Sequence, residues 1–348
     1  MQSIISRRPV RLHPILLTIA LLVFALAGLG TPEEAMACAA CGCTLSTNWQ
    51  SQGINTTPGF TFNLAYSYLN QNQQRYGSGK ASNAQIAALN AAGAEVEDYT
   101  RTQTITASLN YTSDVWGASI QLPYVMRSHG TFGAGGTWPS TAPGNYLSSS
   151  DNSIGDIRVI GRYTGFTKDR SSGLIIGAKL PTGSTNATFN DGSAVDPSLQ
   201  IGTGSTDVIL GGFVSGNIDS YGWFVQGTVQ HAVATKSFGG LDYHPGDTYS
   251  LNTGIRHSKF GAKFTPMLQL NVVHRLADTG PAATPADPLT GGAATGGTLV
   301  YLAPGATLRT GGGTSLYGFL QLPVYQQVNS LQLAPSYTLT LGMRKSFQ

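Results

Sequence analysis

The segment GFTFNLAYSYLN, residues 59–70, alternates large apolar side chains with small or polar ones at a period of two. In an extended strand, one face would carry Phe60, Phe62, Leu64, Tyr66 and Tyr68. The opposite face would carry the small and polar side chains that lie between them. Such a strand fits a wall that has hydrocarbon on one side and water on the other.

The composition of the whole chain agrees with this interpretation. Only 11% of the 348 residues are charged, whereas soluble domains have about 25%. Beyond residue 37, no stretch approaches the ~20 apolar residues that a transmembrane helix needs. Few charges, 15 Tyr, 13 Phe and no helical span are typical of a transmembrane β-barrel. The small net charge of +3 disfavours nucleic acid as a partner.

The same pattern recurs along the chain. We expect twelve strands, which begin near residues 59, 101, 116, 153, 172, 204, 221, 247, 261, 298, 314 and 335. The links between them alternate between short and long, up to an intermediate last link near residues 327–334. A soluble β-sandwich would lack that alternation. The sequence therefore predicts an all-β fold, a twelve-stranded antiparallel transmembrane β-barrel with short periplasmic turns and long extracellular loops.

One of the long links has a composition of its own. The stretch ASNAQIAALNAAGAE, residues 81–95, is rich in alanine and has no proline. It could form a short surface helix or remain an irregular loop.

The C-terminal segment YTLTLGMRKSFQ alternates in the same way and ends with Phe347, one residue before the terminus. It resembles the last strand of bacterial outer-membrane proteins, which the barrel assembly machinery recognises by a terminal aromatic residue. The resemblance implies an outer-membrane protein of a Gram-negative bacterium. Its expected partners are outer-membrane lipid and the assembly machinery.

The N-terminal segment reads as an export signal. Arg7, Arg8 and Arg11 precede a mostly apolar run, residues 15–29, and Ala35-Met36-Ala37 has the small-x-small pattern of a signal peptidase site. We therefore expect a signal peptide at residues 1–37. A periplasmic, cysteine-bearing segment would follow at residues 38–58, and the barrel would occupy residues 59–348.

Three motifs in the middle of the chain occur in order on successive expected strands. They are GDIRVIGRYTGF (155–166), GLIIGAKLPTG (173–183) and QIGTGSTDVILGGF (200–213). They resemble an outer-membrane barrel family named for the meta-pathway of phenol degradation, whose members are presumed transporters of small, often apolar compounds. A cysteine cluster after the signal is similar to one branch of that family. The resemblance implies a barrel and uptake of a small-molecule solute.

The glycines of these motifs have an architectural interpretation. Pro181 and Gly183 lie where a strand would leave the membrane, and Gly202 and Gly204 would permit a bend where the next strand begins. No helical pattern follows them, so a phosphate-binding loop is disfavoured.

If the apolar face of each strand meets lipid, the ionisable residues of the opposite face line the lumen. The basic ones are Arg127, Arg158, Arg162, Lys179, Arg256, Lys263 and Arg344. The acidic ones are Asp156 and Asp207, and the amides include Gln121, Gln226, Gln230, Asn252, Gln269 and Asn271. This set fits a pore that favours anions, or a site that binds a carboxylate or phosphate. The alternative is a structural network in which both aspartates pair with arginines across the lumen.

All three cysteines lie in CAACGC, residues 38–43. Haem attachment is disfavoured because Gly42 follows the CxxC motif, and lipidation of Cys38 is disfavoured because Ala35 stands where a lipobox has leucine. A disulfide between Cys38 and Cys41 would leave Cys43 as a free thiol. All three thiolates could instead bind a soft metal, copper or zinc.

Two hypotheses about function follow, and neither is an enzyme, because no His lies close to a nucleophilic Ser motif. The first is a channel or transporter that passes a small solute, anionic or aromatic, through a basic lumen. The second is a barrel-anchored metal-binding or redox-partner protein, in which Cys38, Cys41 and Cys43 exchange copper, zinc or electrons with a periplasmic protein.

Overall fold

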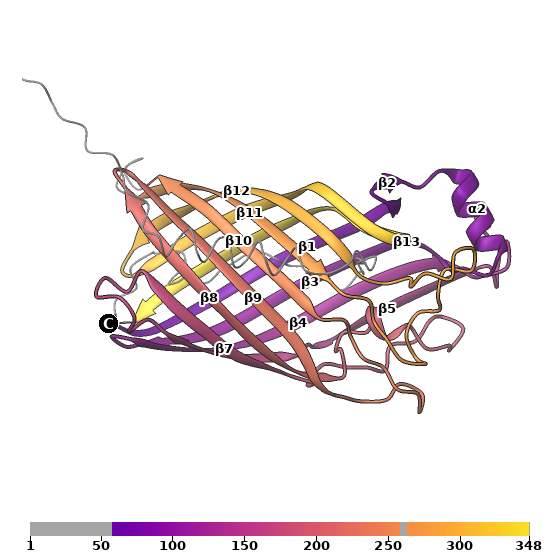
Figure 1. Ribbon diagram of the computed structural model, residues 1–348, viewed down its shortest axis with the longest axis horizontal. Coiled ribbons are helices and arrows are strands. Elements are labelled where there is room, and N and C mark those ends of the chain that lie inside the picture. The colour runs from indigo at the N-terminus through magenta and orange to yellow at the C-terminus, as the bar shows by residue number, and fades with distance from the viewer. Residues whose placement is uncertain (1–57, 258–262, 348) are drawn as a thin grey trace, which may run out of the picture. The chain divides into compact units, whose positions relative to one another are not determined.

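The computed structural model describes residues 58–257 and 263–347, and the wall of the fold is one antiparallel sheet (Figure 1). Its strands are β1 (Gly59–Gly77), β3 (Val96–Thr112), β4 (Trp116–Phe132), β6 (Ile157–Tyr163), β7 (Ser172–Leu180), β8 (Ser205–Ile218), β9 (Tyr221–Thr235), β10 (Thr248–His257), β11 (Phe264–Arg275), β12 (Gly297–Gly311) and β13 (Thr314–Phe347). The strands β2 (Gly79–Lys80) and β5 (Tyr146–Ile154) lie outside this series. Within the described part of the chain, no helix is long and apolar enough to cross a membrane.

The sheet closes on itself because the first strand pairs with the last. The antiparallel register of β1 and β13 runs without a break from Phe60 opposite Phe347 to Asn70 opposite Tyr337. Each other wall strand pairs with its neighbours in sequence order. Closure gives every wall strand two hydrogen-bonded neighbours, which a sheet in hydrocarbon requires. The fold is therefore a closed antiparallel β-barrel of eleven strands.

β13 explains why the structure has eleven wall strands where twelve were expected. Its first part, up to Val328, pairs with β12, and its second part, from Leu331, pairs with β1. The chain reverses at Ser330, which has a φ of 26°. The expected link near residues 327–334 is therefore a reversal that lies within the residues of β13, and twelve separate strands are not confirmed.

A second difference concerns the strand expected to begin near residue 153. The structure has β5 and β6 there, separated by Gly155 and Asp156. β5 pairs with the part of β4 that ends at Phe132, and β6 pairs with the part that begins at Trp116. Only β6 continues the wall to β7. The expected strand is thus interrupted at the first motif, GDIRVIGRYTGF.

The two faces of the wall follow the alternation seen in the sequence. On β7, Leu174 and Ile176 are exposed on the outer face, while Ile175 and Lys179 are buried on the inner face. Aromatic pairs lie on the outer face where β1, β3, β4 and β6 meet the short links: Trp116 contacts Tyr163 at 4.6 Å and Phe60 contacts Tyr111 at 5.0 Å between ring centroids. Such an apolar band with aromatic girdles is typical of a wall in lipid.

The two rims of the barrel differ. The turn end carries Gly59, Phe347 and the links 113–115, 219–220 and 312–313. The loop end carries the links 181–204 and 276–296 and the helix α2 (Asn83–Ala91), which lies beyond the wall at the right of Figure 1. Ser82 and Gln85 form a capping box that begins α2. The sequence allowed either a helix or an irregular loop in residues 81–95, and the structure has a helix there.

The glycines of the second and third motifs meet at the base of link 181–204. A Cβ on Gly202 would lie 2.4 Å from the carbonyl oxygen of Gly183, and a Cβ on Gly183 would lie 2.6 Å from the Cα of Gly202. Gly204 has a φ of 65°, which favours glycine. The architectural interpretation of these glycines fits this close approach.

We expect the substitution Gly202→Ala to destabilise the barrel by about 1–3 kcal/mol, because the added methyl group has no room. The free energy of unfolding would be measured by urea titration of the refolded barrel in lipid. Gly133→Ala is the control, since its nearest atom would lie 3.9 Å away. Equal stability of the two variants would contradict the close-packing argument.

Candidate functional site

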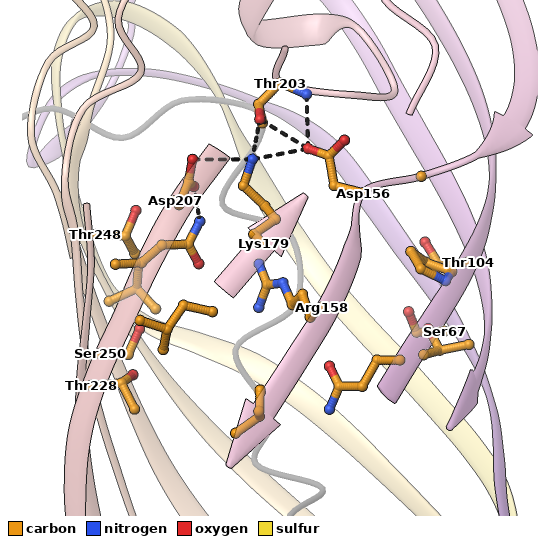
Figure 2. Close-up of a pocket in the computed structure, with 18 of the residues that line it drawn as sticks. Ser67, Thr104, Asp156, Arg158, Lys179, Thr203, Asp207, Thr228, Thr248 and Ser250 are labelled. Atoms are coloured by element: carbon orange, nitrogen blue, oxygen red, sulfur yellow. Dashed lines mark hydrogen bonds and ion pairs between the residues drawn. The ribbon is translucent and has the colours of Figure 1, made fainter. Parts of the chain in front are cut away.

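A cavity of about 500 Å³ lies inside the barrel, and polar side chains from several strands line it (Figure 2). The strands β1 and β3 supply hydroxyls, namely Ser67, Thr102, Thr104, Thr106 and Ser108. The opposite strands β9 and β10 supply Gln226, Thr228, Gln230, Thr248, Ser250 and Asn252. Most of the charged groups come from β6 to β8 and the link before β6, and β4 and β11 add Arg127 and Arg275. Among the polar side chains that line the cavity, neutral ones outnumber charged ones.

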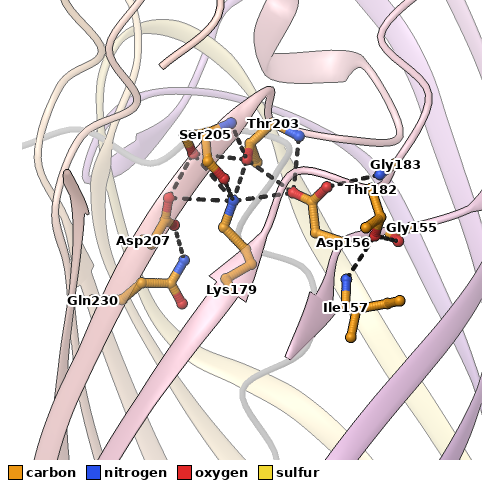
Figure 3. A network of polar contacts seen from close by, with 10 residues as sticks. All are labelled: Gly155, Asp156, Ile157, Lys179, Thr182, Gly183, Thr203, Ser205, Asp207 and Gln230. Atoms are coloured by element: carbon orange, nitrogen blue, oxygen red, sulfur yellow. Dashed lines mark hydrogen bonds and ion pairs between the residues drawn. The ribbon is translucent and has the colours of Figure 1, made fainter. Parts of the chain in front are cut away.

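Lys179 is the centre of a buried polar network (Figure 3). Its Nζ donates to Asp156 Oδ2 at 3.0 Å and lies 3.3 Å from Asp207 Oδ1. It also donates to the carbonyl oxygen of Ser205 at 2.8 Å and to the hydroxyl of Thr203. The three charged side chains are less than a tenth exposed. The ammonium group thus has a full set of acceptors in a site shielded from water.

Both carboxylates have further donors. Asp156 accepts from the backbone N–H groups of Gly183 and Thr203 at 3.0 and 3.1 Å. Asp207 accepts from the Ser205 hydroxyl at 2.6 Å and from Gln230 Nε2 at 2.5 Å. The network therefore joins β7 and β8 to the interruption between β5 and β6, where the wall has lost part of its strand pairing.

The sequence allowed a structural network as the alternative to an anion site, and the structure corrects the cation expected in that network. Asp156 and Asp207 form their ion pairs with Lys179 of the neighbouring strand rather than with arginines across the lumen. Lys179 lies opposite Arg158 of β6 and Asp207 of β8. Knowledge of this register would have predicted the pair with Asp207, but not the pair with Asp156, which precedes β6.

Arg127 fastens link 181–204 to the inner wall. Its Nη1 donates to the carbonyl oxygens of Leu199 and Gln200 at 2.7 and 2.9 Å, and its Nε donates to Thr102 Oγ1 at 3.1 Å. Earlier in the link, the ring of Phe189 lies 5.9 Å from the ring of the buried His129. The link therefore folds into the loop end of the lumen, above the cavity.

Link 181–204 also contacts link 276–296, which starts on a distant strand. Thr284 Oγ1 donates to Asp196 Oδ2 at 3.2 Å. Asp287, in the second link, accepts from Ser330 Oγ at 2.7 Å and from Tyr76 Oη at 3.3 Å. Burial raises the pKa of Asp287, but its hydrogen bonds from Ser330 and from backbone N–H groups outweigh burial and hold the pKa below its usual value. An ionised Asp287 thus ties the links at this end to the bend of β13.

Arg158 and Arg162 lie on the inner face of β6 and both line the cavity. Arg158 is exposed to it, and Figure 2 shows its guanidinium in the same space as Lys179. Arg162, four residues farther along β6 toward the turn end, is buried. Neither forms an ion pair with Asp156 or Asp207.

The other three expected basic residues lie nearer the turn end. Arg256 donates to Asn217 Oδ1 at 3.2 Å. Arg344 lies opposite Asn63 in the β1–β13 pairing, and Asn63 lines the cavity. Lys263 is exposed and precedes β11, so the structure does not bring it to the cavity.

Sequence reasoning missed one lumenal ion pair. Arg275 lines the cavity, and its Nη2 donates to Asp278 Oδ1 at 2.5 Å. Asp278 also accepts from Tyr243 Oη at 3.0 Å and from the backbone N–H of Gly246 at 2.8 Å. Asp278 belongs to a loop, where alternation does not apply, so the sequence carried no periodic signal for this pair.

The amides expected on the inner face divide into two groups. Gln121, Gln226, Gln230 and Asn252 line the cavity, whereas Gln269 and Asn271 are fully buried. Asn252 Nδ2 donates to Asn271 Oδ1 at 2.8 Å, and Asn271 Nδ2 donates to Gln321 Oε1 at 3.3 Å. These bonds form a ladder across β10, β11 and β13 rather than a binding surface.

Cys38, Cys41 and Cys43 lie outside the described residues, as do the expected signal peptide and nearly all of the expected periplasmic segment. Within residues 58–257 and 263–347, no group of three or more His, Cys, Asp or Glu side chains could hold a metal ion.

Comparison with known proteins places this fold. No protein family model and no curated protein matches the chain. Among solved structures, an outer membrane channel from Pseudomonas putida F1 is 12% identical; the match covers 84% of this chain and 97% of that one, with a TM-score of 0.56. The toluene transporter TbuX of Ralstonia pickettii is 11% identical, with 84% and 90% covered and a TM-score of 0.40. The chain thus has an outer-membrane β-barrel fold, and it is located in the outer membrane of a Gram-negative bacterium.

Replacing Lys179 by methionine would leave Asp156 and Asp207 buried beside each other without their cation. We expect Lys179→Met to lower the free energy of unfolding by about 3–5 kcal/mol, measured by urea titration of the refolded barrel. The triple variant Asp156→Asn, Asp207→Asn and Lys179→Met should recover part of that loss. Lys168→Met, at an exposed position, serves as the control; a Lys179→Met barrel as stable as this control would show that the network does not hold the wall.

Removing the guanidinium of Arg127 should free link 181–204 from the inner wall. We expect Arg127→Met to make the link sensitive to chymotrypsin, which would cut after Phe189 or Leu199 in intact cells or proteoliposomes. Arg101→Met, at an exposed position of β3, is the matched control. Fragments of equal yield from both variants would mean that Arg127 does not fix the link.

Proposed function

We propose that this protein is an outer-membrane channel that passes a small solute through the lumen. The observation that carries the proposal is the polar cavity inside a barrel whose outer face is apolar. The likeness to an outer membrane channel from Pseudomonas putida F1 supports the fold on which this function depends. In this proposal, the loop end faces the exterior and the turn end faces the periplasm.

The charges of the lumen favour anions. Lys179 pairs with both Asp156 and Asp207, which leaves one negative charge in that trio, and Arg275 pairs with Asp278. Arg127 donates to the carbonyl oxygens of Leu199 and Gln200. Among the described residues, five basic side chains line the cavity against two acidic ones, and the basic set includes Arg158 and Arg162. A positive potential along the path would raise the local concentration of anions.

Finer features are part of the same proposal. We take the two parts of β13 as separate membrane passes, which makes twelve in all with short links on the periplasmic side. The solute class suggested by the meta-pathway motifs is a small aromatic compound, and the lumen acts without chemical catalysis. No observation on the described residues favours the metal-binding alternative, which is not carried further.

The direct test is single-channel recording of the refolded mature barrel in a planar bilayer with a salt gradient. We expect steady conductance with a reversal potential that indicates anion preference. Arg158→Gln should shift that potential toward zero, because it removes an exposed lumenal charge, whereas Lys263→Gln should leave it unchanged. A silent barrel would contradict the channel, and cation preference would contradict the basic lumen.

A further inference from the structure

Arg162 is buried without any acidic partner in the described residues. Its side chain is 6% exposed and lines the cavity. No hydrogen bond or ion pair joins it to any residue within 58–257 or 263–347, and its Nε is fully enclosed without an acceptor. A buried guanidinium is costly unless an anion or several acceptors compensate it. Arg162 is therefore a candidate binding position for an anion that the described residues do not supply.

The neighbouring strand adds a second unsatisfied group. Ser119 is 1% exposed, and its hydroxyl has no hydrogen-bond partner in the described part of the chain. Ser119 lies opposite Ile160, and Arg162 lies opposite Gly117, which has no side chain. By this register, the Ser119 hydroxyl is diagonal to Arg162 on the inner face. Two polar groups without hydrogen-bond partners thus lie diagonally across the β4–β6 pair on the inner face.

The other side of Arg162 is apolar and aromatic. Arg162 lies opposite Ile175, and the next inward position of β7 is Gly173, opposite Phe213. The ring of Phe213 covers Gly173, since a Cβ there would lie 2.7 Å from the ring. Ile175 and Phe213 are both buried. A ligand bound to Arg162 would therefore meet an apolar surface along β7 and β8.

The two carboxylates of the inner face that lie within the motifs pair with a residue other than Arg162. Asp156 and Asp207 both bind Lys179, and in the turns Asp114 contacts Arg170 while Asp169 accepts from Ser171. None of these four carboxylates pairs with Arg162. Among the described residues, Arg162 therefore has no compensating anion, and a bound solute could supply one.

We propose that Arg162 and Ser119 bind the carboxylate of a small aromatic acid, whose ring packs against Ile175 and Phe213. This inference rests on the proposed channel function and names the class of its solute. The guanidinium recognises a planar carboxylate through paired N–H donors. The aromatic surface beside it selects for a ring over a small aliphatic acid. The site would lie between Lys179 and the turn end, on the path of a solute.

The test measures binding separately from conduction. Benzoate would be titrated calorimetrically into the refolded mature barrel in detergent, with acetate and benzyl alcohol as probes that lack the ring or the charge. We expect benzoate to bind more tightly than either. Arg162→Gln should weaken benzoate binding by about tenfold to a hundredfold, since a charge-assisted pair is lost. Phe213→Leu should reduce the difference in binding affinity between benzoate and acetate, because the ring of benzoate loses an aromatic contact.

Controls separate folding from binding. Arg309→Gln makes the same change at an exposed position of β12 and should leave benzoate binding unchanged. Arg162→Lys keeps the charge without the planar fork and should bind with intermediate strength, while unheated electrophoresis verifies that each variant is folded. Equal benzoate affinity of the wild type and Arg162→Gln, or no benzoate binding by the wild type, would overturn the site. If the barrel conducts but does not bind benzoate, the channel function stands and the Arg162 site is wrong. If it binds benzoate but does not conduct, the site stands and the channel function is wrong.

Discussion

The pairing of β1 with β13 is the constraint on which the rest of the structure depends. In hydrocarbon, an unpaired strand edge leaves backbone N–H and C=O groups without partners, at a cost of several kcal/mol for each. The continuous register from Phe60–Phe347 to Asn70–Tyr337 removes that edge. Once the ring is closed, each side chain must face either lipid or the lumen. The alternation in the sequence then decides which residues can meet a solute.

One part of the wall departs from this regular scheme. Between β5 and β6 the strand is interrupted at Gly155 and Asp156, and β7 ends at Leu180. The Lys179 network occupies this place and supplies side-chain hydrogen bonds where strand pairing stops. Gly183 and Gly202 bring the two ends of link 181–204 into backbone contact there. The same link then folds over the cavity and is held by Arg127. The interrupted wall and the covered lumen are thus parts of one local arrangement.

Much of the fold could be predicted from local alternation. The strands expected to begin near residues 59, 116, 172, 221 and 314 begin there in the structure. A period of two is a property of each strand alone, so it is visible without knowledge of the neighbours. The reversal at Ser330 falls within the link expected near residues 327–334, although no Gly or Pro in that stretch marks a turn.

The site was less predictable for a physical reason. The sequence placed Lys179, Asp156 and Asp207 on the inner face, but it could not show that one lysine serves both aspartates, because that depends on the register of three strands. Lys263 was expected to face the lumen because it falls on the inward side of the alternation, yet it precedes β11 and is exposed. Arg275 pairs with an aspartate in a loop, and the fold of link 181–204 depends on Arg127, 72 residues from Leu199. Such contacts follow from closure of the barrel and not from any local pattern.

Thiol accessibility tests most directly whether the lumen is an aqueous path with a positive potential. Single cysteines would replace Ser250 on the inner face or Leu174 on the outer face, with Cys38, Cys41 and Cys43 changed to serine. Charged, membrane-impermeant methanethiosulfonate reagents would be added to intact cells. The account predicts that the Ser250→Cys barrel reacts, faster with the anionic reagent than with the cationic one, while Leu174→Cys does not react. A Ser250→Cys barrel that reacts with neither reagent, or faster with the cation, would contradict it.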